Sequence, residues 1–338
     1  MQSRRFEHWF HPAATLAMPD LDVASLSNGA VREIASAFLN NIEQLREAAL
    51  TPLLLVVYAR AQQSIIDQAC ISVFGDLQNR STDDPRIEEF NGATRDNWIR
   101  WQEANESPEA FGERIFLAAG ELDQLQDVHP SVSRGLEATL RGVVLGAWTA
   151  FEVLASDLWE AAVNAHPKTL ASLRGDVSVR SQRSKRSFGA FPNASDDASA
   201  TGKHIRLDFL QANDFNLSNM MGTVLRDRFN FQILTGIQKA YLAAFALPES
   251  PVRRVIRDPA IVALASTRNL LAHRSAKVDQ QFMSDHSQVP MLKSIFPDAT
   301  LGSHLKLSGL NTYNLIQPVL SLAVELIQGV SAIDNEGK

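Results

Sequence analysis

Three side chains within six residues combine a permanent positive charge, a proton-transfer group and an amide: Arg268, His273 and Asn269. A guanidinium stays protonated at physiological pH, and histidine side chains titrate close to neutral pH, so they can accept or donate a proton. In a helix, Asn269 and His273 would lie four residues apart and share one flank. We therefore expect a single helix to direct all three groups toward one cleft.

The helix that must carry these groups has clear start and end signals. Asp258 followed by Pro259 is typical of a helix N-terminus, because Asp caps the first turn and Pro fits the first helical position. The residues expected on its buried stripe are Ile261, Leu264, Ala265, Leu271 and Ala272. The stripe runs to about His273 and places Arg268 in its middle. A buried, unpaired guanidinium is costly, so the pattern predicts a partner for it.

The carboxylate of Glu152 is our candidate for that partner. It lies between Trp148 and Trp159 on a long helix predicted from residue 136 to about residue 166. The alternative is that Glu152 is a solvated residue on the face of this helix. If it does pair with Arg268, the pair could be purely structural, with His273 placed only to favour the helix C-terminus.

The rest of the chain predicts an all-α fold. Apolar residues recur at spacings of three and four, and alternating strand patterns are scarce. In the second half, the pattern predicts helices from 136 to about 166, at 225–245, at 258–273 and at about 310–330, enough for an antiparallel bundle. In the first half, it predicts helices at 31–45, from Pro52 to about 73, around Trp98 and Trp101, and at 107–125.

The charges divide the chain into two parts. Residues 1–127 carry 10 Arg, no Lys and 20 acidic residues, whereas residues 128–338 carry 22 basic and 18 acidic residues. We therefore expect an acidic α-helical N-terminal domain at 1–127 and a helical bundle at 128–338. Such an asymmetry suggests that one part meets a polyanion and the other does not, although ordinary solvated helix faces would also explain it.

The stretch from Arg268 to His273 resembles the R-x4-H motif of the HEPN superfamily (higher eukaryotes and prokaryotes nucleotide-binding), whose members often carry Asn directly after the Arg. The residues that follow, 275–282, resemble the turn and the acidic and aromatic segment found after that motif. The likeness extends over residues 132–333. One position departs from it, because many toxin members have Tyr where this chain has Ser275.

The resemblance implies a metal-independent endoribonuclease. In it, His273 would take the proton from a ribose 2′-hydroxyl, Arg268 would stabilise the phosphorane, and Asn269 would orient the phosphate or the histidine. It also implies a homodimer with both motifs in one cleft, RNA as substrate, and a role in toxin–antitoxin or anti-phage defence systems. An antitoxin or regulatory protein is then an expected partner. The alternative is a non-catalytic helical module that dimerises or binds a nucleotide or protein.

Basic residues near the motif are candidates for contacts with RNA phosphates. They are Arg180, Arg183, Lys185 and Arg186 in a polar loop, Arg253, Arg254 and Arg257 before the motif helix, and Arg274 and Lys277 after the motif. A solvated surface is the alternative for each of them.

Several other classes have no support in the sequence. Phosphate-binding loops, dinucleotide fingerprints and serine-hydrolase motifs are missing, and the histidines lack the spacing of metal ligands, so we predict neither a cofactor nor a metal. The single cysteine, Cys70, cannot form an intramolecular disulfide, which favours a cytoplasmic protein. The most apolar run, residues 53–59, ends at Arg60 and is shorter than a membrane span. We therefore expect no membrane segment.

Overall fold

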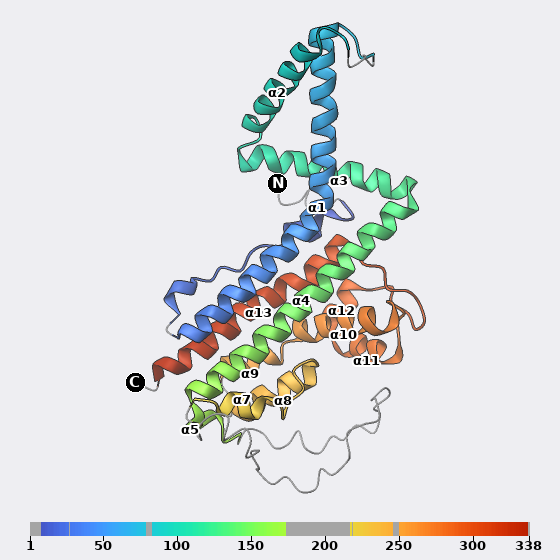
Figure 1. Cartoon of the computed structure of the whole chain (residues 1–338). Helices are drawn as coiled ribbons and strands as arrows, with labels where there is room; N and C mark the ends of the chain where they lie inside the picture. Colours follow the sequence, from blue (N-terminus) through green and yellow to red (C-terminus); the bar gives the residue numbers. More distant parts are fainter. Residues whose placement is uncertain are drawn as a thin grey trace. The chain divides into compact units, whose positions relative to one another are not determined.

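The computed structural model describes residues 8–26, 28–78, 83–173, 217, 219–245 and 250–336. No β-strand is present among them, and the predicted all-α class is confirmed (Figure 1). Two short 3-10 helices, His11–Thr15 and Val23–Ser25, precede the α-helices. The α-helices are α1 (Gly29–Phe74), α2 (Ile87–Glu103), α3 (Pro108–Val128), α4 (Pro130–Ala165), α5 (Pro167–Leu170), α7 (Met221–Arg226), α8 (Leu234–Ala244), α9 (Pro251–Ile256), α10 (Pro259–Arg274), α11 (Gln280–Gln288), α12 (Pro290–Ile295) and α13 (Gly309–Glu336).

The described residues form two compact units. Unit 1 is drawn from Met1–Ala17, Glu43–Leu145 and His304–Ile316, and unit 2 from Met18–Ile42, Gly146–Ser303 and Gln317–Lys338. The long helices α1, α4 and α13 each contribute residues to both units. Both units therefore take residues from either side of position 127, where the charge pattern changes.

Helix α1 is one continuous helix of 46 residues, not the two helices that the sequence predicts on either side of Pro52. Proline normally breaks a helix because it lacks an N–H and its ring meets the preceding turn. Here the buried positions continue past it at helical spacing, with Ala49, Leu53 and Val57 all at least 95% buried. Packing along this stripe outweighs the local cost of Pro52.

In unit 1, α2 runs back along α1 in the antiparallel direction (Figure 1). Phe74 stacks on Phe90, and the side chain of Asn97 donates a hydrogen bond to the carbonyl of Ile65. Tyr58 of α1 then meets Trp101, with ring centroids 5.6 Å apart. Along these three contacts the residue numbers fall in α1 and rise in α2, so the two helices pack antiparallel.

In unit 2, α4 and α8 are joined by two buried hydrogen bonds. The indole N–H of Trp159 donates to the carbonyl of Ala240 over 2.9 Å, and the hydroxyl of Tyr241 donates to the carbonyl of Ala155 over 2.7 Å. Both aromatic side chains are fully buried. Large aromatic groups with satisfied polar atoms thus fix these two helices in register.

The single helix predicted for residues 225–245 is wrong. The structure has α7, a turn, and then α8. The turn lies so close to α8 that a Cβ at Gly236 would overlap the backbone of Asn230. The side chain of Asn230 also accepts a hydrogen bond from the backbone N–H of Gln232, a local bond that competes with helix formation. Apolar spacing alone did not reveal this turn.

Three helices are long and apolar enough to cross a membrane, judged by length and composition. They are Gly29–Phe74, Pro130–Ala165 and the Gly309–Ile333 part of α13. The run at residues 53–59, on which the prediction of no membrane segment rests, is too short by itself. The absence of a membrane segment therefore stays a prediction.

Candidate functional site

Helix α10 carries the motif in its last two turns. The side chain of Asp258 accepts a hydrogen bond from the N–H of Ala260, as the sequence predicts for the helix start. The helix ends at Arg274, followed by Ser275 and Ala276, which both adopt positive φ angles. The N–H of Ala276 donates to the carbonyl of Leu270 and closes the helix end. His273 is thereby fixed in the final turn.

The structure brings two of the three motif side chains together. Arg268 is half-buried, and its Nη1 donates a hydrogen bond to Oδ1 of the exposed Asn269 over 3.0 Å. His273 is exposed and forms no hydrogen bond with either of them. Five residues along a helix correspond to about 7.5 Å of rise and a rotation of about 140°, so Arg268 and His273 leave α10 in different directions.

The predicted stripe of α10 needs one correction. Ala272 is exposed, and Arg268 lies at the edge of the buried surface instead of in its middle. The helix is buried on nearly all sides up to Thr267 and emerges only in its last two turns. The sequence pattern was extended one turn too far, because alanine is small enough for either environment.

Glu152 lies near Arg268 but does not form a direct ion pair with it. Its Oε2 accepts a hydrogen bond from the indole N–H of Trp148 over 3.1 Å. Burial raises the pKa of Glu152, while the positive charge of Arg268 and the Trp148 bond oppose that rise. In the described part of the chain, no carboxylate comes within 4.0 Å of the Arg268 guanidinium.

Glu152 lines a pocket of about 690 Å³ that we call the Glu152 pocket. Its walls come from α4 and from the turn between α7 and α8. The lining residues are Glu152, Val153, Ser156, Arg226, Asp227, Arg228, Phe229, Asn230, Phe231 and Gln232. It contains both acidic and basic side chains beside two aromatic rings.

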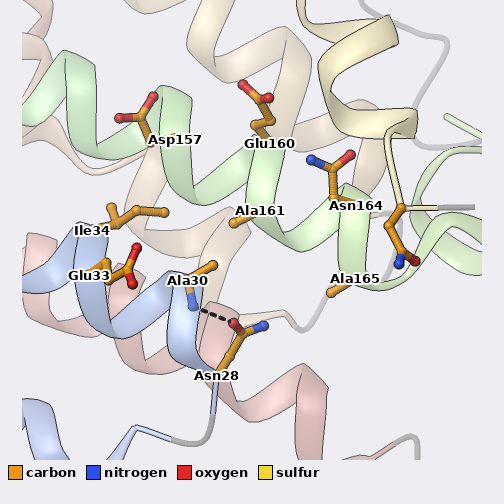
Figure 2. A pocket seen from close by; sticks show the side chains of 10 residues that line it. Asn28, Ala30, Glu33, Ile34, Asp157, Glu160, Ala161, Asn164 and Ala165 are labelled. Atoms are coloured by element: carbon orange, nitrogen blue, oxygen red, sulfur yellow. Dashed lines mark hydrogen bonds between the residues drawn. The ribbon is translucent and has the colours of Figure 1, made fainter. Parts of the chain in front are cut away.

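A second pocket of about 690 Å³, the acidic pocket, lies on another face of α4 (Figure 2). Its lining residues are Asn28, Ala30, Glu33, Ile34, Asp157, Glu160, Ala161, Asn164, Ala165 and Asn219. Three carboxylates and no basic side chain line it. This pocket is therefore unsuited to an RNA phosphate.

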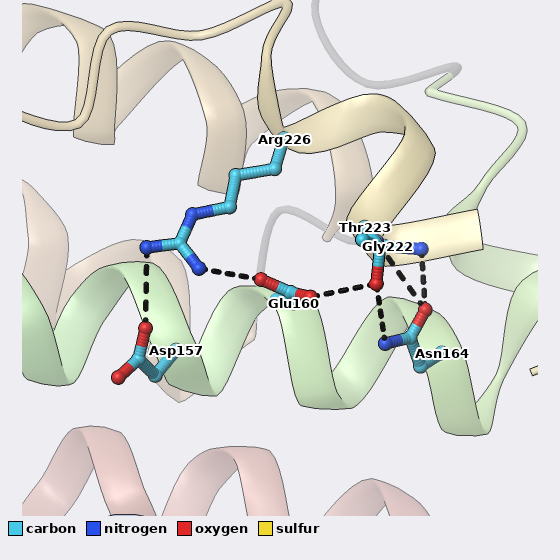
Figure 3. Close-up of polar contacts among 6 residues, drawn as sticks. All are labelled: Asp157, Glu160, Asn164, Gly222, Thr223 and Arg226. Carbon is cyan, nitrogen blue, oxygen red and sulfur yellow. Dashed lines mark hydrogen bonds and ion pairs between the residues drawn. The ribbon is translucent and has the colours of Figure 1, made fainter. Parts of the chain in front are cut away.

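Arg226 connects the walls of the two pockets (Figure 3). Its guanidinium lies 2.6 Å from a carboxylate oxygen of Glu160 and 3.3 Å from one of Asp157. The hydroxyl of Thr223 donates to the other oxygen of Glu160 over 2.6 Å, and the N–H of Gly222 donates to Oδ1 of Asn164 over 2.7 Å. Burial raises the pKa of Asp157, against the opposing charge of Arg226.

The RNA-contact candidates have different surroundings. Arg180, Arg183, Lys185 and Arg186 lie outside the described residues. Arg253 is 7% exposed, so its guanidinium is not offered to a ligand at the surface, contrary to the prediction. The reason is that α9 turns this residue toward the core of unit 2, together with Val252.

The other predicted cations lie at the surface. Arg254 pairs with Glu325, and Arg274 lies 3.5 Å from a carboxylate oxygen of Asp279. Arg257 and Lys277 are exposed, and in the described part of the chain neither forms an ion pair. These two remain the cations most available to a polyanion near α10.

Sequence reasoning missed Ser156, Arg226 and Arg228. Glu152 and Ser156 are four residues apart on a predicted helix, so their shared face could have been inferred. Arg226 binds the carboxylates of Glu160 and Asp157, which lie 66 and 69 positions earlier in the chain. No local sequence pattern predicts contacts over such distances.

Comparison with known proteins adds no relative: no family model, curated protein or solved structure matches this chain. Within the described residues, no group of three or more His, Cys, Asp or Glu side chains is arranged to hold a metal ion.

Proposed function

We propose that this chain is a metal-independent endoribonuclease of the HEPN type. The observation that carries the proposal is the state of Arg268, a half-buried cation with no carboxylate against it in the described residues. An arginine kept only for structure would be expected to bind a carboxylate, as Arg226 does. Arg268 instead contacts the neutral Asn269, which leaves its charge available to an anionic ligand.

The chemistry follows from the residue types. His273 removes the proton from a ribose 2′-hydroxyl, and the 2′-oxygen attacks the adjacent phosphorus. Arg268 stabilises the negative charge that develops on the phosphorane oxygens. The bond from phosphorus to the 5′-oxygen then breaks, which gives a 2′,3′-cyclic phosphate and a 5′-hydroxyl end. Asn269, bonded to Arg268, orients the guanidinium or the phosphate.

The reaction also favours a homodimer. The leaving 5′-oxygen needs a proton, and His273 has already accepted one as base. Arg268 and His273 also leave α10 in directions about 140° apart. A second copy of the chain, related by a two-fold axis, would supply the second histidine and close the cleft around the phosphate.

The cellular setting belongs to the same proposal. A cytoplasmic ribonuclease of this type would act on RNA in a toxin–antitoxin or anti-phage defence system. An antitoxin or regulatory protein would then hold it inactive. The acidic residues of 1–127 would repel RNA, which makes that part of the chain the candidate for regulation or for binding a protein partner.

The test compares purified full-length wild type with Arg268→Ala and His273→Ala on a labelled single-stranded RNA in the presence of EDTA. We expect the wild type to produce cyclic-phosphate ends and each variant to lose at least about 100-fold in rate. Mass spectrometry of the products identifies the ends. Sedimentation shows whether each protein is dimeric.

Two matched substitutions in unit 1 serve as controls. Arg95 and His129 are exposed residues of the same types, and neither belongs to the proposed site. Arg95→Ala and His129→Ala should cut RNA at the wild-type rate. Cleavage by Arg268→Ala and His273→Ala at the wild-type rate would disprove the proposal.

A non-catalytic interaction module is the second candidate. It is favoured by large apolar side chains that unit 1 leaves exposed, namely Leu55, Tyr58, Ile71, Leu77, Ile99, Leu117, Leu125 and Val128. Exposed apolar residues in such number are typical of a surface that binds a partner. If this candidate is right, expression of the wild type and of His273→Ala should affect cell growth equally.

A further inference from the structure

The Glu152 pocket has a floor from one helix and a rim from one turn. Glu152 and Ser156 are four residues apart on α4 and therefore share a face of that helix. The opposite wall is the turn after α7, which carries Arg228, Phe229 and Gln232. All of these residues belong to unit 2, as Arg268 does.

Ser156 is the strongest sign that this pocket takes a ligand. The residue is only 3% exposed, and its hydroxyl forms no hydrogen bond with any described residue. A buried hydroxyl without a partner is unfavourable, and in native proteins such a group calls for an explanation. The oxygen itself is covered, so a ligand in the pocket bonds it only where the neighbouring side chains shift.

Glu152 adds an unused hydrogen-bond acceptor. One of its oxygens accepts the indole N–H of Trp148, while the other receives no donor from the described residues. A carboxylate fixed on one side in this way presents its free oxygen to a ligand N–H group. Burial raises the pKa of Glu152, and the nearby charge of Arg268 opposes that rise. In its ionised form the carboxylate only accepts hydrogen bonds.

The rim offers an aromatic ring and a cation. Phe229 is half-buried and packs edge-on against Trp159, with ring centroids 5.4 Å apart. Arg228 is exposed and forms no ion pair within the described part of the chain. An aromatic surface, fixed hydrogen-bonding groups and a cation together form the usual set of contacts to an unpaired nucleotide.

We infer that the Glu152 pocket binds one unpaired nucleobase that bears an exocyclic amino group. The inference rests on the proposed function, because the base would belong to the RNA strand whose phosphate meets Arg268. The free oxygen of Glu152 accepts from the amino group of the base, as acidic residues do with the N4 amino group of cytosine. Ser156 bonds a neighbouring ring or carbonyl atom, and Arg228 contacts a phosphate.

Uracil is the base that this arrangement rejects. Cytosine carries an amino group at C4, where uracil carries a carbonyl oxygen. A carbonyl placed against a carboxylate oxygen would leave both acceptors without a donor. The pocket should therefore select adenine, guanine or cytosine over uracil at one position of the RNA.

The experiment measures binding of CMP and UMP to the full-length His273→Ala protein by isothermal titration at pH 7.5. This variant keeps the pocket and prevents cleavage. CMP should bind at least about tenfold more tightly than UMP. Inorganic phosphate, titrated alone, reports how much of the affinity comes from the phosphate group.

Two further substitutions locate the preference in the pocket. Glu152→Gln, added to His273→Ala, replaces an acceptor with a group that can also donate, so UMP should gain affinity relative to CMP. Glu33→Gln makes the same change in the acidic pocket and should leave the ratio unchanged. Ser156→Ala should weaken both nucleotides without altering the ratio as Glu152→Gln does.

The outcomes separate this inference from the proposed function. RNA cleavage by the wild type with equal binding of CMP and UMP would overturn the inference alone. A Glu152-dependent preference for CMP without any RNA cleavage would support the nucleotide pocket and count against the ribonuclease. A preference that survives Glu152→Gln would also overturn the assignment to this pocket.

Discussion

Arg226 and Arg268 both approach α4, but they are used in opposite ways. Arg226 is bound on two sides by Asp157 and Glu160, and Thr223 holds one of these carboxylates in place. Among the described residues, Arg268 has only the neutral Asn269 as its hydrogen-bond partner, and its positive charge acts on the nearby carboxylate of Glu152. One arginine is bound by carboxylates of the fold, and the other is the one that we propose binds a ligand.

The two pockets also differ in the charged and hydrogen-bonding groups that line them. At 100° per residue, the residues of α4 in the acidic pocket lie on average roughly 130° around the helix from Glu152 and Ser156. One face gathers carboxylates and amides, and Arg226 partly neutralises them. The other face places a single carboxylate and an unsatisfied hydroxyl beside aromatic rings. Pockets of equal volume therefore suit different ligands.

Gly222→Ala should break this comparison most strongly, because it disturbs the contact of α7 with α4, the helix that lines both pockets. A Cβ at this position would overlap the backbone carbonyl of Glu160 and lie 3.0 Å from Oδ1 of Asn164. Helix α7 would have to move away from α4 and take Arg226 with it. We expect a loss of about 2–3 kcal/mol in the free energy of unfolding, measured by denaturant titration.

Gly142→Ala is the matched control for that experiment. Gly142 lies in the middle of α4, and a Cβ there would meet nothing within 4 Å. Alanine should stabilise the helix by about 0.5–1 kcal/mol. An equal loss of stability in both variants would show that the loss in Gly222→Ala does not come from its contact with α4.

Arg226→Met and Arg268→Met sharpen the comparison between the two arginines. The first leaves Asp157 and Glu160 without their cation, and we expect a cost of about 1–2 kcal/mol because the network is partly exposed to solvent. The second removes no ion pair and should cost less than about 0.5 kcal/mol. Thermal unfolding followed by circular dichroism measures both. Equal losses would mean that Arg268 is also a structural residue.

The helices were largely predictable because their signals are local. The cap at Asp258 and the helix start at Ser107 and Pro108 were read correctly from neighbouring residues. The errors arose where packing overrode a local signal, as at Pro52, or where a turn depended on the close approach of Gly236 to Asn230. Local rules describe the free energy of one segment and cannot include what distant segments contribute.

The candidate site was predictable only in part. Arg268, Asn269 and His273 were found because they lie within one turn and a half of the same helix. The pocket beside Glu152 was not found, because its second wall comes from residues 226–232, more than 70 positions later. Side chains that meet only through the tertiary fold leave no spacing to recognise in a single sequence.

The smallest expected effect is a difference in pH dependence between Glu152→Gln and the wild type. Burial raises the pKa of Glu152 above its ordinary value, so the folded protein binds this proton more tightly than the unfolded chain does. The contribution of Glu152 to stability is thus fully present below the unfolded pKa of about 4.5 and is lost as the pH rises through the higher folded value. Glu152→Gln removes this loss, so its melting temperature should exceed that of the wild type by at most about 2 °C at pH 7.5 and match it near pH 4. A gain of equal size at both pH values would show that ionisation of Glu152 is not its cause.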